Sequence, residues 1–368
     1  MRVVTGATGF LGREVVRSLA RQGAEPIRCL VRPGTPPERL AAVSAAAGPG
    51  ARLELCPVRL DDRTALTRAL AGARAVYHAA AVKRGAPAAL VAGTVVPTEH
   101  LLHAARAAAV ERVVLVSSFS VMGVAGLRHG GLVDEEAPLE PRPEDRDAYA
   151  FAKLRQEQLA WRLSEELRVP LAVVRPGMIF GPGQELLGSR LGLALGPLFL
   201  ALGGRCTLPL TYVENCADAV VLAGTAPAAA GRALCVVDDD LPTARAVLAR
   251  YRREVSALVA LPVPYPLLLL LARANAWYTR RTAGHLPAVL TPYKVRSMWR
   301  PQRFSNHRAR AVLGWSPRVP MQEALDRTFA GLAARGAPRP PARLGAPAPV
   351  ARAAASALAT PPSAEARA

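Results

Sequence analysis

The side chains best suited to acid–base chemistry in this sequence are Tyr149 and Lys153. They lie four residues apart in Tyr-Ala-Phe-Ala-Lys, so on a helix the phenol and the ammonium share one face. Because a neighbouring cation stabilises phenolate, we expect Lys153 to lower the pKa of Tyr149 from its usual value of about 10. Such a phenol could exchange a proton with a substrate oxygen. A surface Tyr-Lys pair has the same spacing and remains the alternative when the pair is taken alone.

Two hydroxyl groups, Ser117 and Ser118, close the apolar run Val113–Val116. This run predicts a strand, and a doubly wound sheet carries its chemistry at the carboxyl ends of its strands. A serine at that place could hold a substrate oxygen beside Tyr149. Turn formation at the end of the strand is the alternative role for these serines.

An anion-binding turn is predicted at Thr5–Gly12, which reads Thr-Gly-Ala-Thr-Gly-Phe-Leu-Gly. It follows a short apolar run and precedes a helical pattern over Glu14–Gln22. Gly6 would allow the tight bend, Gly9 the approach of a pyrophosphate, and Gly12 close packing of helix on strand. The N-terminus of the helix would offer free N–H groups to the anion. An ordinary strand, turn and helix is the structural alternative.

The elements that must position these groups alternate between strand and helix through the first half of the chain. This order favours an α/β fold, a Rossmann-like doubly wound parallel sheet with a smaller C-terminal lobe that binds the substrate. With 368 residues, 51% of them hydrophobic, the chain can bury a large core. We expect residues 1–176 to form the dinucleotide-binding domain and residues 177–333 mainly the substrate-binding lobe, interleaved with the first. Residues 337–368 are rich in Ala and Pro and are expected to be disordered.

Together these features resemble the extended short-chain dehydrogenase/reductase superfamily, and within it the NAD-dependent epimerase/dehydratase family. The resemblance runs from Met1 to about Leu332. Further stretches match the family in order, namely Ala75–Ala81, Arg175–Gly183, Tyr212–Ala219 and Leu313–Pro317. Because so many stretches match in one order, the resemblance implies the fold of this superfamily for all but the C-terminal tail.

The resemblance also implies roles for individual residues. Ser118 stands five residues before Gly123 and is the implied substrate-orienting hydroxyl, with Ser117 as the alternative register. Tyr149 is the implied acid/base, and Lys153 is its partner. Cofactor contacts are implied at Gly6, Thr8, Gly9, Phe10, Leu11, Gly12, Arg32, Leu60, Ala79, Ala80, Ala81, Tyr149, Lys153 and Pro176.

Positions near these residues separate the reactions of the superfamily. Dehydratases carry an acidic pair just after the catalytic hydroxyl, where this chain has Phe119 and Ser120, so dehydration is not expected. Sugar-nucleotide epimerases place an Asn where this chain has Met178. The pattern is nearest the 3β-hydroxysteroid dehydrogenase-like branch, which implies an NAD(P)-dependent enzyme that interconverts a secondary alcohol and a ketone. Its substrate would be apolar, either steroid- or lipid-like or a β-keto acid. A nucleotide-sugar epimerase and a non-catalytic nucleotide-binding protein remain the alternatives.

The choice of cofactor depends on Arg32, which ends the predicted second strand. An acid at this place would bind the 2′-hydroxyl of the adenosine ribose, whereas a guanidinium suits a 2′-phosphate. We therefore expect a preference for NADP(H), with NAD(H) as the alternative. A solvated arginine in the loop before Pro33 is the structural alternative.

Three positions depart from the family pattern. Arg59 replaces the Asp that usually lies near the adenine, and it could bind the adenosine end or lie on the surface. Thr94 replaces the Asn that opens the helix before the fifth strand, which predicts an altered water network or helix start. Ala152 replaces the Ser before the catalytic lysine and removes one hydroxyl from the nicotinamide side.

The segment 257–272 is apolar throughout and is flanked by Arg253 and Arg273. Its prolines and its length exclude a membrane-spanning helix, which needs about 20 apolar residues in succession. The segment predicts a strand, a turn and a buried helix of the substrate lobe. A lipid-facing lid on a membrane surface is the alternative.

The net charge of +19 comes from 47 basic residues spread along the chain, without the signatures of a nucleic-acid binder, so no nucleic-acid partner is expected. The cysteines are odd in number and lack the spacing of metal ligands, so buried thiols and no metal are predicted: Cys29, Cys56, Cys206, Cys216 and Cys235. No signal segment precedes the first strand, and we expect a cytoplasmic protein, with peripheral membrane contact through 257–272 as an alternative. The family suggests a homodimer.

Overall fold

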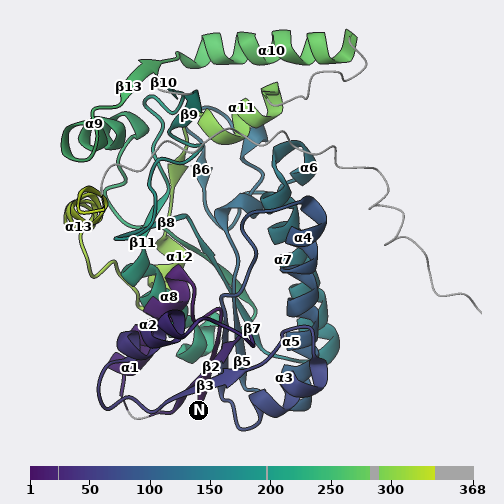
Figure 1. Cartoon of the computed structure of the whole chain (residues 1–368). Helices are drawn as coiled ribbons and strands as arrows, with labels where there is room; N and C mark the ends of the chain where they lie inside the picture. Colours follow the sequence, from purple (N-terminus) through teal and green to yellow (C-terminus); the bar gives the residue numbers. More distant parts are fainter. Residues whose placement is uncertain (24, 196–197, 282–289, 336–368) are drawn as a thin grey trace, which may run out of the picture.

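A seven-stranded parallel sheet forms the centre of the computed structural model (Figure 1), which describes residues 1–23, 25–195, 198–281 and 290–335. From one edge to the other its strands are β12 (Arg232–Val236), β7 (Leu171–Pro176), β5 (Arg112–Val116), β4 (Ala75–His78), β1 (Arg2–Thr5), β2 (Ile27–Val31) and β3 (Leu53–Pro57). All neighbouring strands run parallel. The predicted Rossmann-like α/β class is confirmed.

Helices cover both faces of the sheet, which explains why its central strands are apolar on both sides. One face carries α1 (Phe10–Arg21), α2 (Pro37–Ala47), α8 (Val213–Thr225) and α12 (His307–Leu313). The other face carries α3 (Arg63–Leu70), α4 (Pro87–Ala92), α5 (Val95–Ala107) and α7 (Ala148–Leu167). Helix α1 begins at Phe10, earlier than the pattern over Glu14–Gln22 predicts, because it follows the glycine turn without an intervening loop.

The strand order reverses between β1 and β4, and this reversal marks the functional edge of the sheet. Crossovers from β1 proceed outward through β2 and β3, while those from β4 proceed in the other direction through β5 and β7. The loops that leave the carboxyl ends of β1 and β4 therefore separate and open a crevice, which is where doubly wound folds bind ligands. Thr5 and His78 are the last residues of these two strands.

Strand β12 joins the sheet beside β7 only after the whole stretch 177–231. This stretch forms β8 (Met178–Phe180), which pairs in parallel with β11 (Leu210–Tyr212), and it then returns to the sheet through α8. The chain thus crosses between the sheet and the second lobe more than once. The boundary expected at residue 176 stays a prediction.

The second lobe lies beyond the carboxyl edge of the sheet (Figure 1). It contains a small sheet of β9 (Gly192–Leu195), β10 (Leu198–Ala201) and β13 (Val259–Pro262), with β13 at one edge. Around it lie α9 (Ala244–Glu254), α10 (Tyr265–Arg281), α11 (Pro292–Trp299) and α13 (Met321–Ala333). The short α6 (Pro143–Arg146) and the two-stranded pair β6 (Leu132–Val133) and β14 (Arg303–Phe304) connect the lobes.

The apolar segment 257–272 forms β13, a turn and the first part of α10, as its pattern predicts. The expectation of a buried helix is wrong, because α10 buries only Leu268 and Ala272. No helix in the described ranges is both long and apolar enough to cross a membrane. All five cysteines are free thiols, four of them buried and Cys56 partly exposed. The tail 337–368, expected to be disordered, lies outside the described residues.

Candidate active site

The predicted serine, tyrosine and lysine meet where β5 ends and α7 begins. Ser118 follows β5, and its Oγ accepts a hydrogen bond from the Ser120 amide at 3.1 Å, which fixes the turn after the strand. Asp147 caps α7 by accepting from the Ala150 amide at 2.7 Å, so Tyr149 stands in the first turn of the helix. Lys153 follows one turn later on the same face. The hydroxyl of Ser118 is hydrogen-bonded to the phenol of Tyr149.

The acidity of Tyr149 is set by its burial. Burial raises the pKa of this phenol to about 12, and the hydrogen bond with Ser118 acts in the opposite direction. The predicted lowering by Lys153 is wrong for this structure, because the neighbours that shift this pKa are Ser118 and Asp147. The phenol is therefore protonated at neutral pH and available as a proton donor.

Lys153 is a buried cation, with 2% of its surface exposed. Its Nζ donates to the Val116 carbonyl at 2.7 Å and to Oε1 of Gln156. The pKa of Lys153 is lowered to about 7, chiefly by burial; Glu157 acts in the opposite direction, and the charge of the nearby Lys83 adds to the lowering. Its ammonium thus titrates close to neutral pH, far below the usual value for lysine.

The alternative serine, Ser117, faces a different set of partners. Its Oγ donates to Oε2 of Glu157 at 2.5 Å, and Glu157 forms a buried ion pair with Arg175 at 2.5 Å. These contacts hold the Ser117 hydroxyl beneath α7, so Ser118 is the serine whose hydroxyl reaches Tyr149. Sequence reasoning missed Glu157, although its place four residues after Lys153 puts it on the same helix face.

A buried chain of polar side chains connects Lys153 with the end of β1. Gln156 Nε2 donates to Oγ1 of Thr98 at 2.7 Å, and this oxygen lies 2.9 Å from His78 Nε2. On the other side of the ring, His78 Nδ1 lies 2.7 Å from Oγ1 of Thr5. Burial lowers the pKa of His78 to about 3, so the imidazole is neutral. The chain therefore links the catalytic helix to the strand that precedes the glycine turn.

The proton of the Thr98 hydroxyl determines the direction of these hydrogen bonds. The Thr98 hydroxyl donates to the Thr94 carbonyl at 2.8 Å. His78 Nε2 must then donate to Thr98, which leaves Nδ1 to accept from the Thr5 hydroxyl. Thr94, which replaces the family's Asn, also accepts from the Val82 amide at 3.2 Å through its own hydroxyl. The altered water network or helix start expected around Thr94 stays a prediction.

The glycine turn brings the backbones of β1 and β4 into direct contact. Gly6 has φ +69°, and a Cβ at this position would lie 2.8 Å from the Ala80 nitrogen. A Cβ at Gly12 would lie 2.0 Å from the Gly6 carbonyl oxygen. Gly9 caps α1, whose first turn holds neither an acidic residue nor a side-chain cap. The amide groups at this helix end therefore face the crevice without a side-chain partner, an arrangement that suits a pyrophosphate.

The other predicted cofactor residues lie along the same edge of the sheet. Thr8 and Phe10 are partly exposed at the turn, and Leu11 is buried in the core beneath it. The ring of Phe10 lies beside Gly181, where a Cβ would be 3.2 Å from its Cζ. The run Ala79–Ala81 follows β4 and is partly exposed, and the buried Pro176 ends β7. The fold thus places all of them at the carboxyl ends of β1, β4 and β7.

Arg32 and Leu60 lie at the carboxyl ends of β2 and β3. Arg32 is exposed, and within the described ranges its guanidinium has no hydrogen-bond or ion-pair partner. Leu60 is partly exposed. Arg59 is paired with Asp61, with 2.9 Å from Nε to Oδ1, while Asp62 caps α3. This pairing favours the surface role of Arg59.

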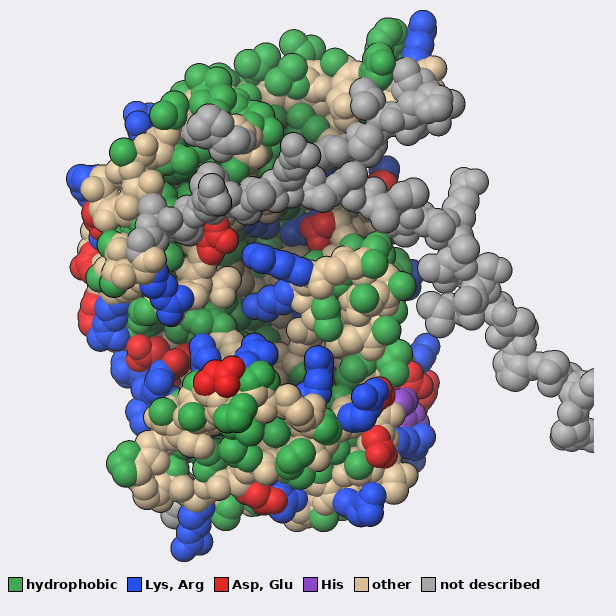
Figure 2. All heavy atoms as spheres, viewed as in Figure 1, with side chains coloured by type: hydrophobic (Ala, Val, Ile, Leu, Met, Phe, Trp, Pro, Cys, Tyr) green, Lys and Arg blue, Asp and Glu red, His purple; other side chains and the backbone are tan. Residues whose placement is uncertain are grey.

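Two arginines that sequence reasoning missed lie near the first turn of α7. Arg146 is buried, forms an ion pair with the buried Glu140 at 3.5 Å, and donates to the carbonyls of Ser120 and Met122 at 2.9 and 3.0 Å. Its Nε has no hydrogen-bond partner among the described residues. Burial and the charge of Arg146 lower the pKa of Arg190 to about 10. In Figure 2, Lys and Arg side chains surround the hollow between the sheet and the second lobe. Because the chain contains many arginines, the sequence alone does not single out these two.

Comparisons with known proteins agree with this geometry. The profile of the NAD dependent epimerase/dehydratase family matches residues 2–236. The chain is 28% identical over 369 residues to 3beta-hydroxysteroid-dehydrogenase/decarboxylase isoform 1 of Arabidopsis thaliana, covering 92% of this chain and 81% of that protein. It is 29% identical over 346 residues to 2-alkyl-3-oxoalkanoate reductase of Stenotrophomonas maltophilia, covering 90% and 99%.

A solved structure shares the fold. UDP-glucuronic acid 4-epimerase from Bacillus cereus, in complex with NAD, matches with a TM-score of 0.67 at 18% identity, covering 91% of this chain and 99% of that one. The glycine turn, Ser118, Tyr149 and Lys153 all fall within the residues that the family profile matches. The chain belongs to the NAD dependent epimerase/dehydratase family.

Proposed function

We propose that this protein is an NAD(P)-dependent oxidoreductase that interconverts a secondary alcohol and a ketone on an apolar substrate. Membership of the family identifies it, more coarsely, as an NAD-dependent oxidoreductase or epimerase. The observation that carries the finer proposal is the hydrogen-bonded pair of Ser118 and Tyr149 beside the buried Lys153. Phe119 and Ser120 occupy the positions at which a dehydratase would need acids.

The raised pKa of Tyr149 suits the reductive direction. The protonated phenol can give its proton to a carbonyl oxygen while that carbon receives a hydride, and in the oxidative direction it takes the proton back from the alcohol. When bound, the nicotinamide would supply or accept the hydride. Ser118 would hold the substrate oxygen and stabilise negative charge that develops on it.

The residues at the carboxyl edge of the sheet fit a nicotinamide dinucleotide. The amides at the start of α1 would hold the pyrophosphate, against a turn where only glycine fits at Gly6 and Gly12. Lys153, whose ammonium is positioned by the Val116 carbonyl, would hold the nicotinamide ribose. The unpaired guanidinium of Arg32 supports a preference for NADP(H) over NAD(H), because it could form charge-assisted hydrogen bonds to a 2′-phosphate.

Two observations support an apolar substrate, steroid- or lipid-like, or a β-keto acid. Met178 occupies the place where sugar-nucleotide epimerases carry an Asn. The two relatives named above are a 3beta-hydroxysteroid dehydrogenase/decarboxylase and a reductase of 2-alkyl-3-oxoalkanoates.

Turnover with defined substrates tests this proposal. We expect NADP(H)-dependent absorbance changes with a hydroxysteroid or a 2-alkyl-3-oxo acid, and a loss of about 100- to 10,000-fold in kcat for Tyr149→Phe. The variant should bind NADP(H) in calorimetry as the wild type does, because its main cofactor contacts remain. Tyr265→Phe, which alters a phenol in α10, is the matched control and should retain activity.

Full activity in Tyr149→Phe would contradict the assignment of the acid. Turnover of a nucleotide sugar without added nicotinamide, together with oxidised NAD that copurifies with the protein, would identify an epimerase instead. Binding of neither NADP(H) nor NAD(H) would favour a non-catalytic role for the fold.

A further inference from the structure

Helix α10 is apolar on two opposite sides, and the described residues of the chain cover only one of them. Its inner side includes Leu268 and Ala272, which pack into a core with Trp299. Its outer side carries residues at helical spacing whose exposed fractions are large: Leu267 46%, Leu270 60%, Leu271 48%, Trp277 53% and Tyr278 46%. Single exposed leucines are common on soluble proteins, but a continuous outer stripe marks a contact surface.

The neighbouring strand β13 extends this stripe. It is the edge strand of its sheet, and its side chains Val259 and Leu261 are 64% and 52% exposed. Val259 pairs with Leu198, and Leu198 pairs with Leu195, so these three side chains share one face of the sheet. Figure 2 shows hydrophobic side chains along the upper border of the molecule, where Figure 1 places β13 and α10. We call Val259, Leu261 and the outer side of α10 the apolar ridge.

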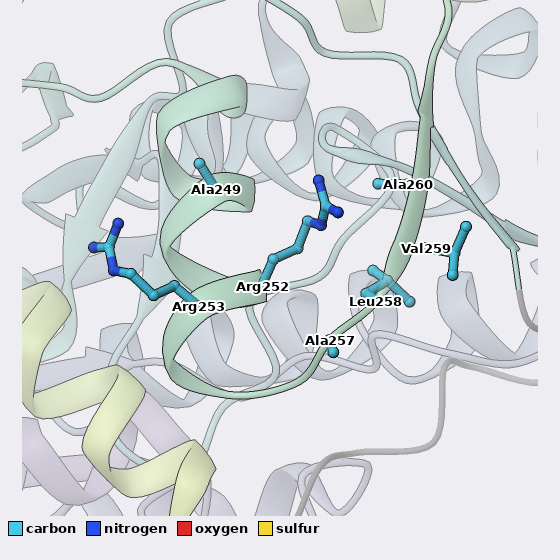
Figure 3. Close-up of a pocket in the computed structure, with 7 residues that line it drawn as sticks. All are labelled: Ala249, Arg252, Arg253, Ala257, Leu258, Val259 and Ala260. Atoms are coloured by element: carbon cyan, nitrogen blue, oxygen red, sulfur yellow. The ribbon is translucent and has the colours of Figure 1, made fainter.

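Basic residues accompany the apolar ridge, and acidic residues do not. Between Glu254 and Glu323 the sequence contains no Asp or Glu. Arg273, Arg280 and Arg281 lie on α10, and the Arg281 guanidinium lies 4.8 Å from the centre of the Trp277 ring. In the hollow of Figure 3, Arg252 extends from α9 toward β13 and reaches over the space beside Val259 and Ala260. The ridge therefore combines apolar side chains with arginines from α9 and α10.

We propose that the apolar ridge docks the protein onto the surface of a bilayer that contains anionic phospholipids. Leucine side chains would enter the boundary between headgroups and acyl chains, Trp277 and Tyr278 would lie at headgroup level, and the arginines would contact lipid phosphates. This proposal does not depend on the catalytic assignment. It assigns an interaction surface to the second lobe, on the side that faces away from the seven-stranded sheet.

The charges favour a membrane over a second copy of the chain. In a two-fold symmetric dimer the same surface lies on both sides of the interface, so each copy would place its arginines against those of the other. With no acidic residue between Glu254 and Glu323, this part of the chain offers no carboxylate to compensate them. An anionic bilayer supplies both the apolar interior and the compensating phosphates.

Flotation of the full-length protein with vesicles tests the proposal. The probes are vesicles of phosphatidylcholine alone and of phosphatidylcholine mixed with phosphatidylserine. We expect binding to the mixed vesicles, weakened on the order of tenfold by Leu270→Ser with Trp277→Ser and by Arg273→Gln with Arg280→Gln. The matched controls are Val96→Ser, exposed on α5, and Arg63→Gln with Arg68→Gln, exposed on α3. The controls should bind as the wild type does.

Sedimentation of the same variants without vesicles tests whether the ridge instead contacts a second copy of the chain. Equal vesicle binding by all variants, or none by the wild type, would overturn the proposal. A wild-type dimer that the two ridge variants convert to monomers, without vesicle binding, would assign the ridge to self-association and would likewise overturn it. Because the altered side chains are exposed, folded variants are expected, and circular dichroism checks this.

Discussion

Burial displaces the pKa values of the two central residues in opposite directions. It raises the pKa of Tyr149 to about 12 and lowers that of Lys153 to about 7, since a buried site disfavours phenolate and ammonium alike. The phenol thus keeps its proton across the physiological range. Of these two residues, Lys153 is therefore the one whose titration should affect activity near neutral pH.

Gln156 is the positioning residue for this ammonium. Its Oε1 accepts from Lys153 Nζ, while its amide donates to Thr98. Gln156→Met keeps the volume but removes the acceptor, which disfavours the charged lysine and lowers its pKa further. We expect the alkaline limb of the profile of kcat/KM against pH to move down by about one unit.

The control for this experiment is Gln158→Met, an exposed position on the same helix. Its pH profile should coincide with that of the wild type. A Gln156→Met protein that is less stable but retains the wild-type profile would show that the side chain only fills space.

Among the elements, the turn between β1 and α1 depends on close backbone packing. A Cβ at Gly12 would lie 2.0 Å from the Gly6 carbonyl oxygen, and backbone atoms cannot yield as a flexible side chain can. We expect Gly12→Ala to lower the free energy of unfolding by about 1–3 kcal/mol or more, measured by urea denaturation. NADP(H) binding should weaken as well, because α1 would move away from β1.

Gly126→Ala serves as the comparison, since no atom lies within 4 Å of a Cβ built there. This variant should unfold at nearly the wild-type urea concentration. Equal stability of both variants would mean that α1 can shift without cost, and that the turn does not require glycine for packing.

The sequence predicts those elements whose pattern is local. The glycine turn, the strand that ends in Ser117 and Ser118, and the helix of Tyr149 and Lys153 each carry their own signal, and the structure contains all three. The ion pair of Glu157 with Arg175 depends on α7 lying over β7, which no local pattern encodes. Hydropathy likewise predicts that α10 is apolar, but not that its outer side has no covering element among the described residues.

The expected lowering of the Tyr149 pKa fails for a related reason. Helical spacing correctly places Lys153 on the face of Tyr149, but it says nothing of the Val116 carbonyl and Gln156, which hold the ammonium. Desolvation of the phenol, which also requires the tertiary fold, is the larger influence on its pKa.

At the scale of the whole molecule, Asn215 joins three distant parts of the chain. From α8 its Nδ2 donates to Asp238 Oδ2 at 3.1 Å and to the Val319 carbonyl at 2.9 Å, and its Oδ1 accepts from the Val319 amide at 2.9 Å. Asn215→Ala would leave both backbone groups of Val319 buried without these partners. We expect a loss of about 1–3 kcal/mol in unfolding free energy for each group, measured by urea denaturation.

Thr225→Ala alters an exposed side chain at the end of the same helix and should change this free energy by less than about 0.5 kcal/mol. If Asn215→Ala were equally harmless, the segment that leads into α13 would be held by its apolar contacts alone.

Strand β12 is synthesised long after its partner β7, which has a consequence for folding on the ribosome. When β7 has emerged, its outer edge has no neighbouring strand, because β12 begins only at Arg232. At about 5–20 residues per second, the stretch 177–231 leaves that edge open for several seconds. A nascent chain that stalls in this interval would expose an apolar strand able to pair with other chains, so translation speed across this stretch should affect the yield of folded protein.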